Sequence, residues 1–195
     1  GTNNIAIGYL ALRNEDTHGH NTAIGFGSLM LQDAGAEGYN TAIGHETGKA
    51  TTTGVNNTLV GSFAGTATTT GTNNVALGYG ALRAEDTGGR NIAVGYAAGA
   101  LMTTGVENTI IGGSAGDAIT TGGYNTLMGV HAGGGLVEGT DNVAIGWSAL
   151  KTEDAHGGNV AIGKEALKTL DAGAEGYNVA VGHRAGYLMT TGVQN

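Results

Sequence analysis

The chain has 195 residues, with 39 glycines, no proline, no cysteine and a formal net charge of −8. A disulfide framework and thiol chemistry are excluded because there is no cysteine, and collagen is excluded because glycine does not recur at every third position. Nucleic acid is not an expected partner, since 8 Lys and Arg spread along the chain cannot form the basic stripe that phosphates require. No stretch reaches the ~18 consecutive apolar residues of a membrane span, so we expect no membrane contact within this segment.

A five-residue phrase, Asn-x-apolar-apolar-Gly, recurs along the whole chain and organises it. Its copies begin at Asn4, Asn21, Asn40, Asn57, Asn74, Asn91, Asn108, Asn125, Asn142, Asn159 and Asn178. The period is 17 residues and lengthens to 19 only after Asn21 and Asn159. Such a period predicts a solenoid, so we expect residues 1–195 to be a single repeat array of eleven coils. The array begins in mid-repeat and ends on a further Asn without capping repeats, which indicates a segment of a longer protein.

Each phrase has the composition of a short strand. Helices are excluded as the main element, because a glycine follows every apolar run and another lies near the next Asn. The chain is therefore predicted to be all-β, a parallel β-solenoid of the β-roll or β-helix kind. The third and fourth residues of a phrase are apolar in every copy and point to opposite faces of the strand. One face should line the coil interior and the other should pack on another chain, which predicts a homo-oligomer; which column does which remains open.

The invariant Asn and Gly are predicted to serve backbone geometry. Asn tolerates a left-handed backbone, and its amide can bond the neighbouring coil or stack as a ladder. Gly allows the sharp turn that follows the strand. We therefore assign neither residue a chemical role.

Two levels of repetition occur in the array. The eighth residue after the Asn is Leu in some coils and Gly in the others, where a Thr-Thr-Gly turn usually follows. Residues 141–195 also echo residues 3–57, including the segments 33–39 and 171–177 that lengthen two of the coils. These two segments are expected to bulge outward from the rod.

Catalysis is not supported, because the Ser, His and Asp residues belong to repeating columns and not to an isolated cluster. We expect no enzyme activity and no cofactor. The residue after the invariant Gly forms a column rich in aromatic residues, namely Tyr9, Phe26, Tyr79, Tyr96 and Trp147. These rings could stack on sugars of a cell surface or pack at a subunit boundary, and we favour packing.

Four residues are candidates for a metal site. His18 and His20 have a His-x-His spacing that could surround a metal in a trimer, although a polar surface corner is the favoured interpretation. Asp16 and Asp33 fall at the same offset in adjacent coils, as do Asp154 and Asp171, and stacked carboxylates repel unless a cation lies between them. Ion pairs with Arg13, Lys151 and Lys168 are the preferred interpretation of these aspartates.

The phrases resemble repeats of two fibre families. Asn-Val-Ala-Ile-Gly at 142–146 and Asn-Ile-Ala-Ile-Gly at 4–8, each followed by Ala149 or Ala11, resemble the head repeats of trimeric autotransporter adhesins. The segment 57–65 with its Thr-Thr-Gly-x-Asn-Asn continuation is similar to repeats of bacteriophage tail fibres. The adhesin resemblance implies a left-handed parallel β-roll, although the adhesin coil is shorter than 17 residues.

Both resemblances imply a homotrimeric, extracellular attachment fibre, on a virion tail or a bacterial surface. In that interpretation the chain is the structural and adhesive shaft or head that presents a receptor-binding region to a cell, whose glycan or protein is the receptor. The alternative is a flat-faced binding solenoid for ice or glycan, suggested by the Thr-Thr-Gly turns. Adjacent Thr side chains diverge, however, and the turns are missing from the Leu coils.

Overall fold

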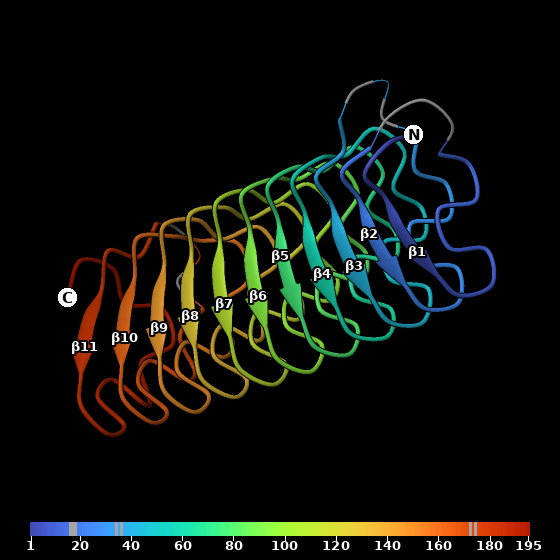
Figure 1. The fold of residues 1–195 in the computed structure, drawn as a ribbon. Helices are drawn as coiled ribbons and strands as arrows, with labels where there is room; N and C mark the ends of the chain where they lie inside the picture. Colours follow the sequence, from blue (N-terminus) through green and yellow to red (C-terminus); the bar gives the residue numbers. More distant parts are fainter. Residues whose placement is uncertain (16–18, 34, 36, 172, 174) are drawn as a thin grey trace.

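A computed structural model describes residues 1–15, 19–33, 35, 37–171, 173 and 175–195. In this part of the chain the protein is a rod of stacked coils that runs from one terminus to the other (Figure 1). The strands are β1 (Ile5–Ile7), β2 (Thr22–Ile24), β3 (Thr41–Ile43), β4 (Thr58–Val60), β5 (Val75–Leu77), β6 (Ile92–Val94), β7 (Thr109–Ile111), β8 (Thr126–Met128), β9 (Val143–Ile145), β10 (Val160–Ile162) and β11 (Val179–Val181). Every one of them lies in a predicted phrase, and no helix forms in the described residues.

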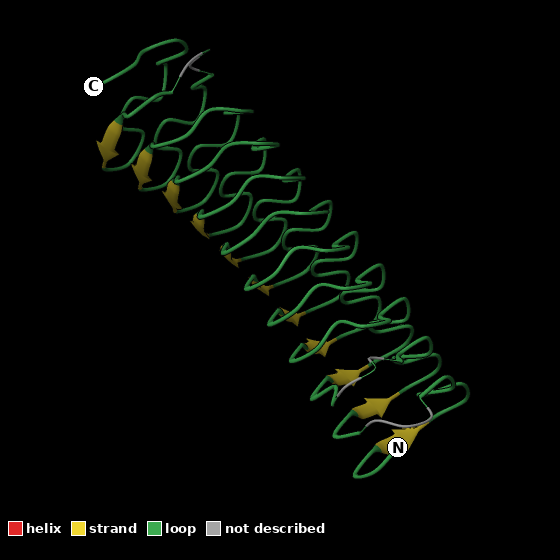
Figure 2. Ribbon diagram, turned by 90° about the horizontal axis from the view of Figure 1, so that it is seen from above, coloured by secondary structure: helices red, strands yellow, loops and turns green. Residues whose placement is uncertain are grey.

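The strands form one parallel sheet in sequence order, β1 to β11. Each strand pairs with the next without a shift in register, so that Ile7 pairs with Ile24 and Ile24 with Ile43. This stacking confirms the predicted parallel β-solenoid with one coil per repeat. The sheet occupies one side of the rod, and turns make up the rest of every coil (Figure 2).

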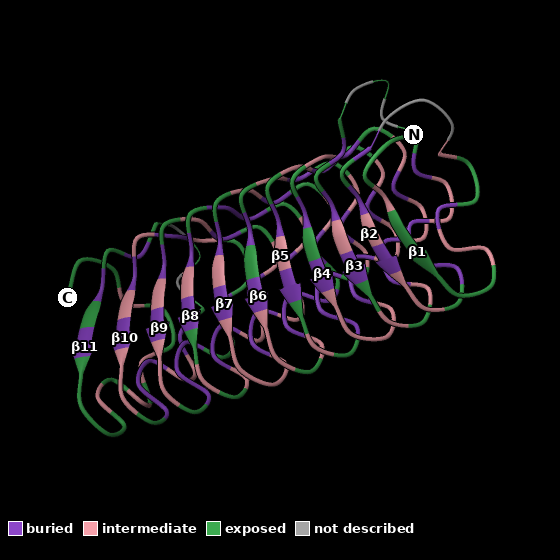
Figure 3. Ribbon diagram, viewed as in Figure 1, coloured by how far each residue is buried: buried purple, intermediate pink, exposed green. Residues whose placement is uncertain are grey.

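The strand faces settle which apolar column lines the core. The middle residue of the internal strands is buried, as for Ala144, whereas its two neighbours remain partly or largely exposed. Met128 and Leu77 in the fourth column expose 43% and 47% of their surface. The third column therefore faces the coil interior, and the second and fourth columns face outward together (Figure 3).

Side-chain volume is balanced across the interior of each coil. A Leu at the eighth position after the Asn, such as Leu82, occurs only in coils whose strand carries Ala at the centre. Coils with a large central residue, such as Leu127, have Gly at the eighth position, and a Cβ on Gly133 would lie 2.8 Å from a Leu127 methyl carbon. Close packing of the interior explains this exchange, because each coil has room for one large side chain at this level.

A ladder of buried asparagines runs along the rod. The Asn142 amide N–H donates to Oδ1 of Asn125 at 3.0 Å, and Nδ2 of Asn125 donates to the Gly139 carbonyl at 2.9 Å. The predicted amide ladder is thus confirmed, but the left-handed backbone is not on the Asn. It lies on the preceding residue, as at Tyr124 with φ 60°. The ladder satisfies buried backbone groups that a turn would otherwise leave unpaired.

The invariant glycine after each strand is required by both its conformation and its contacts. Gly129 has a φ of 137°, which side chains rarely adopt, and a Cβ there would lie 2.6 Å from the Gly146 carbonyl oxygen of the next coil. The prediction that this residue serves backbone geometry is therefore confirmed.

Candidate functional site

The outward side of the sheet is a regular surface that runs along the rod from β1 to β11, and we call it the outer sheet face. It consists of the second and fourth residues of each strand, with Ile, Val, Leu or Met in the fourth column and Thr, Val or Ile in the second. Neither column contains a charged residue. In the internal strands Ile43, Leu77 and Ile92 are all more than a third exposed. A continuous apolar strip of this kind is typical of an interaction surface.

The threonines fall into two groups, one on the outer sheet face and one in the turns. Thr22, Thr41 and Thr58 follow one another on the outer sheet face, but the next two positions of that column are Val75 and Ile92. The Thr-Thr-Gly turns lie elsewhere, and in four of them the hydroxyl of the first Thr donates a hydrogen bond to the next coil. In the turn that begins at Thr103, for example, that hydroxyl donates to a carbonyl of the next coil at 3.2 Å.

The aromatic column forms a ladder along one edge of the rod. Tyr9 stacks on Phe26 with ring centroids 5.6 Å apart, and Tyr79 stacks on Tyr96 at 5.5 Å. His45 and Phe63 connect these two pairs, with centroid distances of 5.2 Å to 5.6 Å between successive rings. The five predicted residues are exposed, as a glycan site would need, yet four of them use ring faces or edges against neighbouring coils.

The sequence prediction missed the two connecting rings. His45 shares the column of Phe26, so an aligned reading of the repeats could have found it. Phe63 stands one position later than the column, and only the stacking of coils brings it between its neighbours.

The fifth predicted ring, Trp147, lies apart from the ladder in a basic and aromatic cluster. Lys164 Nζ and Lys168 Nζ lie 5.3 Å and 5.4 Å from the Trp147 ring centroid. Hydrogen bonds from Lys168 and then Arg184 lower the pKa of Glu165 to about 2. Since Lys168 bonds Glu165 at 2.6 Å, the prediction that it pairs with an aspartate is wrong.

Two glutamates, Glu85 and Glu153, are fully buried in the rod, which the sequence prediction missed. Glu85 accepts a hydrogen bond from the Thr68 hydroxyl at 2.9 Å, and its other oxygen has no partner in the described part of the chain. Burial raises the pKa of Glu85 to about 7. Glu153 occupies the same position in its coil and accepts a hydrogen bond from the backbone N–H of His156. Both lie in polar runs of the sequence, so their burial becomes visible only when the coils are aligned.

Of the four predicted metal candidates, the structure describes His20 and Asp33. Asp16 and His18 lie outside the described residues. His20 is an exposed residue that stacks on Tyr39, with ring centroids 4.9 Å apart. Asp33 is exposed, and its backbone N–H donates to a carbonyl of the next coil. A different group, Glu153, His156 and Asp171, has ligand atoms within 4.8 Å of one another.

Comparison with models of known protein families, with curated proteins and with solved structures gave no match. Function is therefore inferred from the surfaces and side chains of this chain. No helix among the described residues has the length and apolar character to cross a membrane. The described residues also form no pocket, so the candidate site is a surface and not a cavity.

Proposed function

We propose that this chain is the structural and adhesive shaft or head of a homotrimeric, extracellular attachment fibre, which presents a receptor-binding region to a cell surface. The observation that carries the proposal is the outer sheet face, where two uncharged and largely apolar columns run the full length of the rod. The number of chains comes from the family resemblance, because an exposed apolar face implies association with a partner but does not determine how many chains associate.

The size of the face suits a permanent assembly. Parallel strands lie ~4.8 Å apart, so the described sheet is about 50 Å long. Each chain would bury one strip of that length against its partners, which gives an interface well above ~1,000 Å². An interface of this size and composition is expected to be mainly hydrophobic.

A substitution on the outer sheet face tests the proposal directly. Ile145→Asp places a charge at the half-buried fourth column of β9, whereas Thr104→Asp places the same charge at an exposed turn away from the sheet. Sedimentation or native mass spectrometry should give a trimer for the wild type and for Thr104→Asp, and a smaller species for Ile145→Asp. A well-folded wild-type monomer would contradict the assembly, and a dimer would contradict the fibre resemblance while leaving the buried face in place.

A flat-faced ice or glycan-binding solenoid is the second candidate, favoured by the outward ladder of Thr22, Thr41 and Thr58. It requires the outer sheet face or the aromatic edge to stay open in solution. A monomer that shows thermal hysteresis or binds a glycan array would support this candidate, whereas a trimer without either activity would support the fibre.

A further inference from the structure

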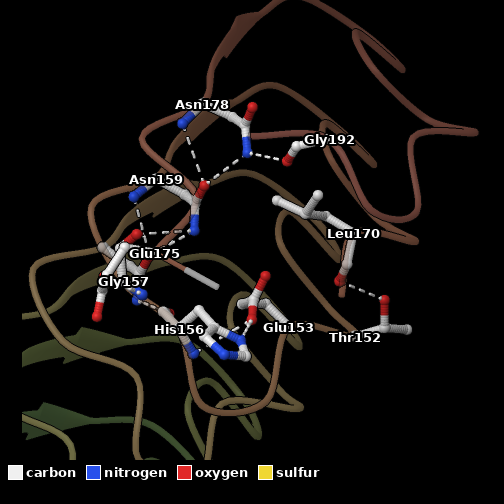
Figure 4. A network of polar contacts seen from close by, with 10 residues as sticks. Thr152, Glu153, His156, Gly157, Asn159, Leu170, Glu175, Asn178 and Gly192 are labelled. Carbon is white, nitrogen blue, oxygen red and sulfur yellow. Dashed lines mark hydrogen bonds and ion pairs between the residues drawn. The ribbon is translucent and has the colours of Figure 1, made fainter. Parts of the chain in front are cut away.

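Three side chains of metal-ligating type meet at the junction of two coils near the C-terminal end of the rod. Ligand atoms of Glu153, His156 and Asp171 all lie within 4.8 Å of one another. Glu153 and His156 belong to the coil that starts at Asn142, and Asp171 belongs to the next, longer coil. His156 places its backbone N–H 3.2 Å and its ring Nδ1 3.1 Å from Oε1 of Glu153 (Figure 4).

Glu153 is a buried carboxylate at a position that is apolar in several other coils. Its side chain is fully buried, and the same position in other coils is held by apolar residues such as Met102, Leu136 and Leu170. A second carboxylate, that of Asp171, lies close to it. Two carboxylates at this separation repel each other. A cation between them would relieve this repulsion.

The same three residue types recur in the first part of the chain. Glu15, His18 and Asp33 have the offsets of Glu153, His156 and Asp171, although many neighbouring positions differ between the two blocks. In the internal 17-residue coils the position of the histidine is glycine. A Cβ on one of these, Gly122, would lie 2.4 Å from a carbonyl oxygen of the next coil. The histidine occurs only before the two longer coils, so the histidine, the longer coil and the aspartate occur together.

Glu85 provides a comparison within the chain. It shares the position of Glu153, but Gly88 and Thr103 take the places of the histidine and the aspartate. One of its oxygens lacks a partner in the described part of the chain, and burial raises its pKa. Glu85 therefore lacks the nitrogen and the second carboxylate that Glu153 has beside it.

We propose that Glu153, His156 and Asp171 bind a divalent transition-metal ion of the Zn²⁺ class, which ties the coil that starts at Asn142 to the coil that follows. One imidazole nitrogen with two carboxylate oxygens suits Zn²⁺, while Ca²⁺ and Mg²⁺ prefer oxygen ligands alone. Three protein ligands leave one position of a tetrahedral ion for water. Asp171 is exposed, which gives the ion access from solvent. All three ligands belong to one chain, so the site does not depend on the proposed assembly.

Zinc titration of the full chain without a histidine tag tests the proposal. Isothermal titration with ZnSO₄ should show saturable binding, and the unfolding temperature should rise when zinc is present. Asp171→Asn replaces an exposed ligand by a residue of the same shape and should weaken binding by about tenfold or more. His156→Ala should remove one zinc ion per chain. The matched control is Glu85→Gln, which changes the equivalent glutamate and should leave zinc binding unaltered.

Several results would overturn the proposal. One is the absence of zinc binding at micromolar concentration. Another is an unchanged stoichiometry and affinity in both Asp171→Asn and His156→Ala. A third is Ca²⁺ binding at the same affinity as zinc without dependence on His156. Circular dichroism of each variant checks that the coil is intact, so that lost binding is not lost folding. Loss of a second ion in the double variant His18→Ala, His156→Ala would extend the site to the first block.

Discussion

The buried carboxyl of Glu85 should make the rod less stable as pH rises, and Glu85→Gln should remove this dependence. Gln has the same shape and keeps an oxygen for the Thr68 hydroxyl, which donates to Glu85 at 2.9 Å. The pKa of Glu85 is raised from 4.5 to about 7, first of all by burial. The folded state therefore holds the proton more tightly than the unfolded state, and stability declines between about pH 4.5 and pH 7 as the unfolded chain ionises.

The magnitude follows from the two pKa values. One unit of pKa difference corresponds to ~1.4 kcal/mol, so the change from 4.5 to about 7 amounts to about 3 kcal/mol in the free energy of unfolding. Wild type and Glu85→Gln should thus have similar stability near pH 4, and the variant should be more stable by about 3 kcal/mol at pH 8. Other carboxylates titrate in both proteins alike and cancel in the comparison.

Urea unfolding of both proteins, followed by circular dichroism between pH 4 and pH 8, measures this difference. Hydrogen exchange adds a local measurement, because the backbone N–H groups of Thr69 and Gly71 donate to the Asp86 carbonyl beside Glu85. Their protection should fall with pH in the wild type only. Glu107→Gln, which alters a surface ion pair with Arg90, is the control and should change stability by less than about 1 kcal/mol. Parallel pH curves for wild type and Glu85→Gln would refute the reasoning.

Three further substitutions test how the coils are held together. Asn125→Ala removes a buried amide and leaves its backbone partners unpaired, which should cost about 2–4 kcal/mol in urea unfolding; a loss below ~0.5 kcal/mol would contradict the ladder. Gly129→Ala should prevent normal folding, because its φ is 137° and a Cβ would meet the next coil, whereas Gly113→Ala faces open space and should melt like the wild type. Ala144→Asp buries a charge in the core and should abolish the β-type circular dichroism. Ile145→Asp on the outer sheet face should keep that spectrum and lose only the assembly, so equal spectra for these two variants would show that the faces are wrongly assigned.

The candidate sites were less accessible to sequence reasoning than the fold. The aromatic column was visible because its members share one offset, yet Phe63 belongs to the same ladder from a different offset. The cluster of Glu153, His156 and Asp171 was not predicted as a group, although Asp171 and the equivalent residues His18 and Asp33 were named separately as candidates. A glutamate in a polar run gives no local sign of burial. The burial of Glu153 could have been inferred only by aligning the coils, because other coils carry a buried Met or Leu at the same position.

The sequence by itself determined the repeat, the strand positions and their register. Parallel stacking of coils requires the same turn at the same place in each repeat. This requirement is visible in the sequence as the invariant Asn and Gly. Only the tertiary structure decided which side of the strand faces inward. Both Ala144 and Ile145 are apolar, so no alternation of polar and apolar residues distinguishes the two faces of a three-residue strand. The path of the chain around the coil determines which face is inside. The stacking of successive coils brings Asp171 beside Glu153, which are in different coils.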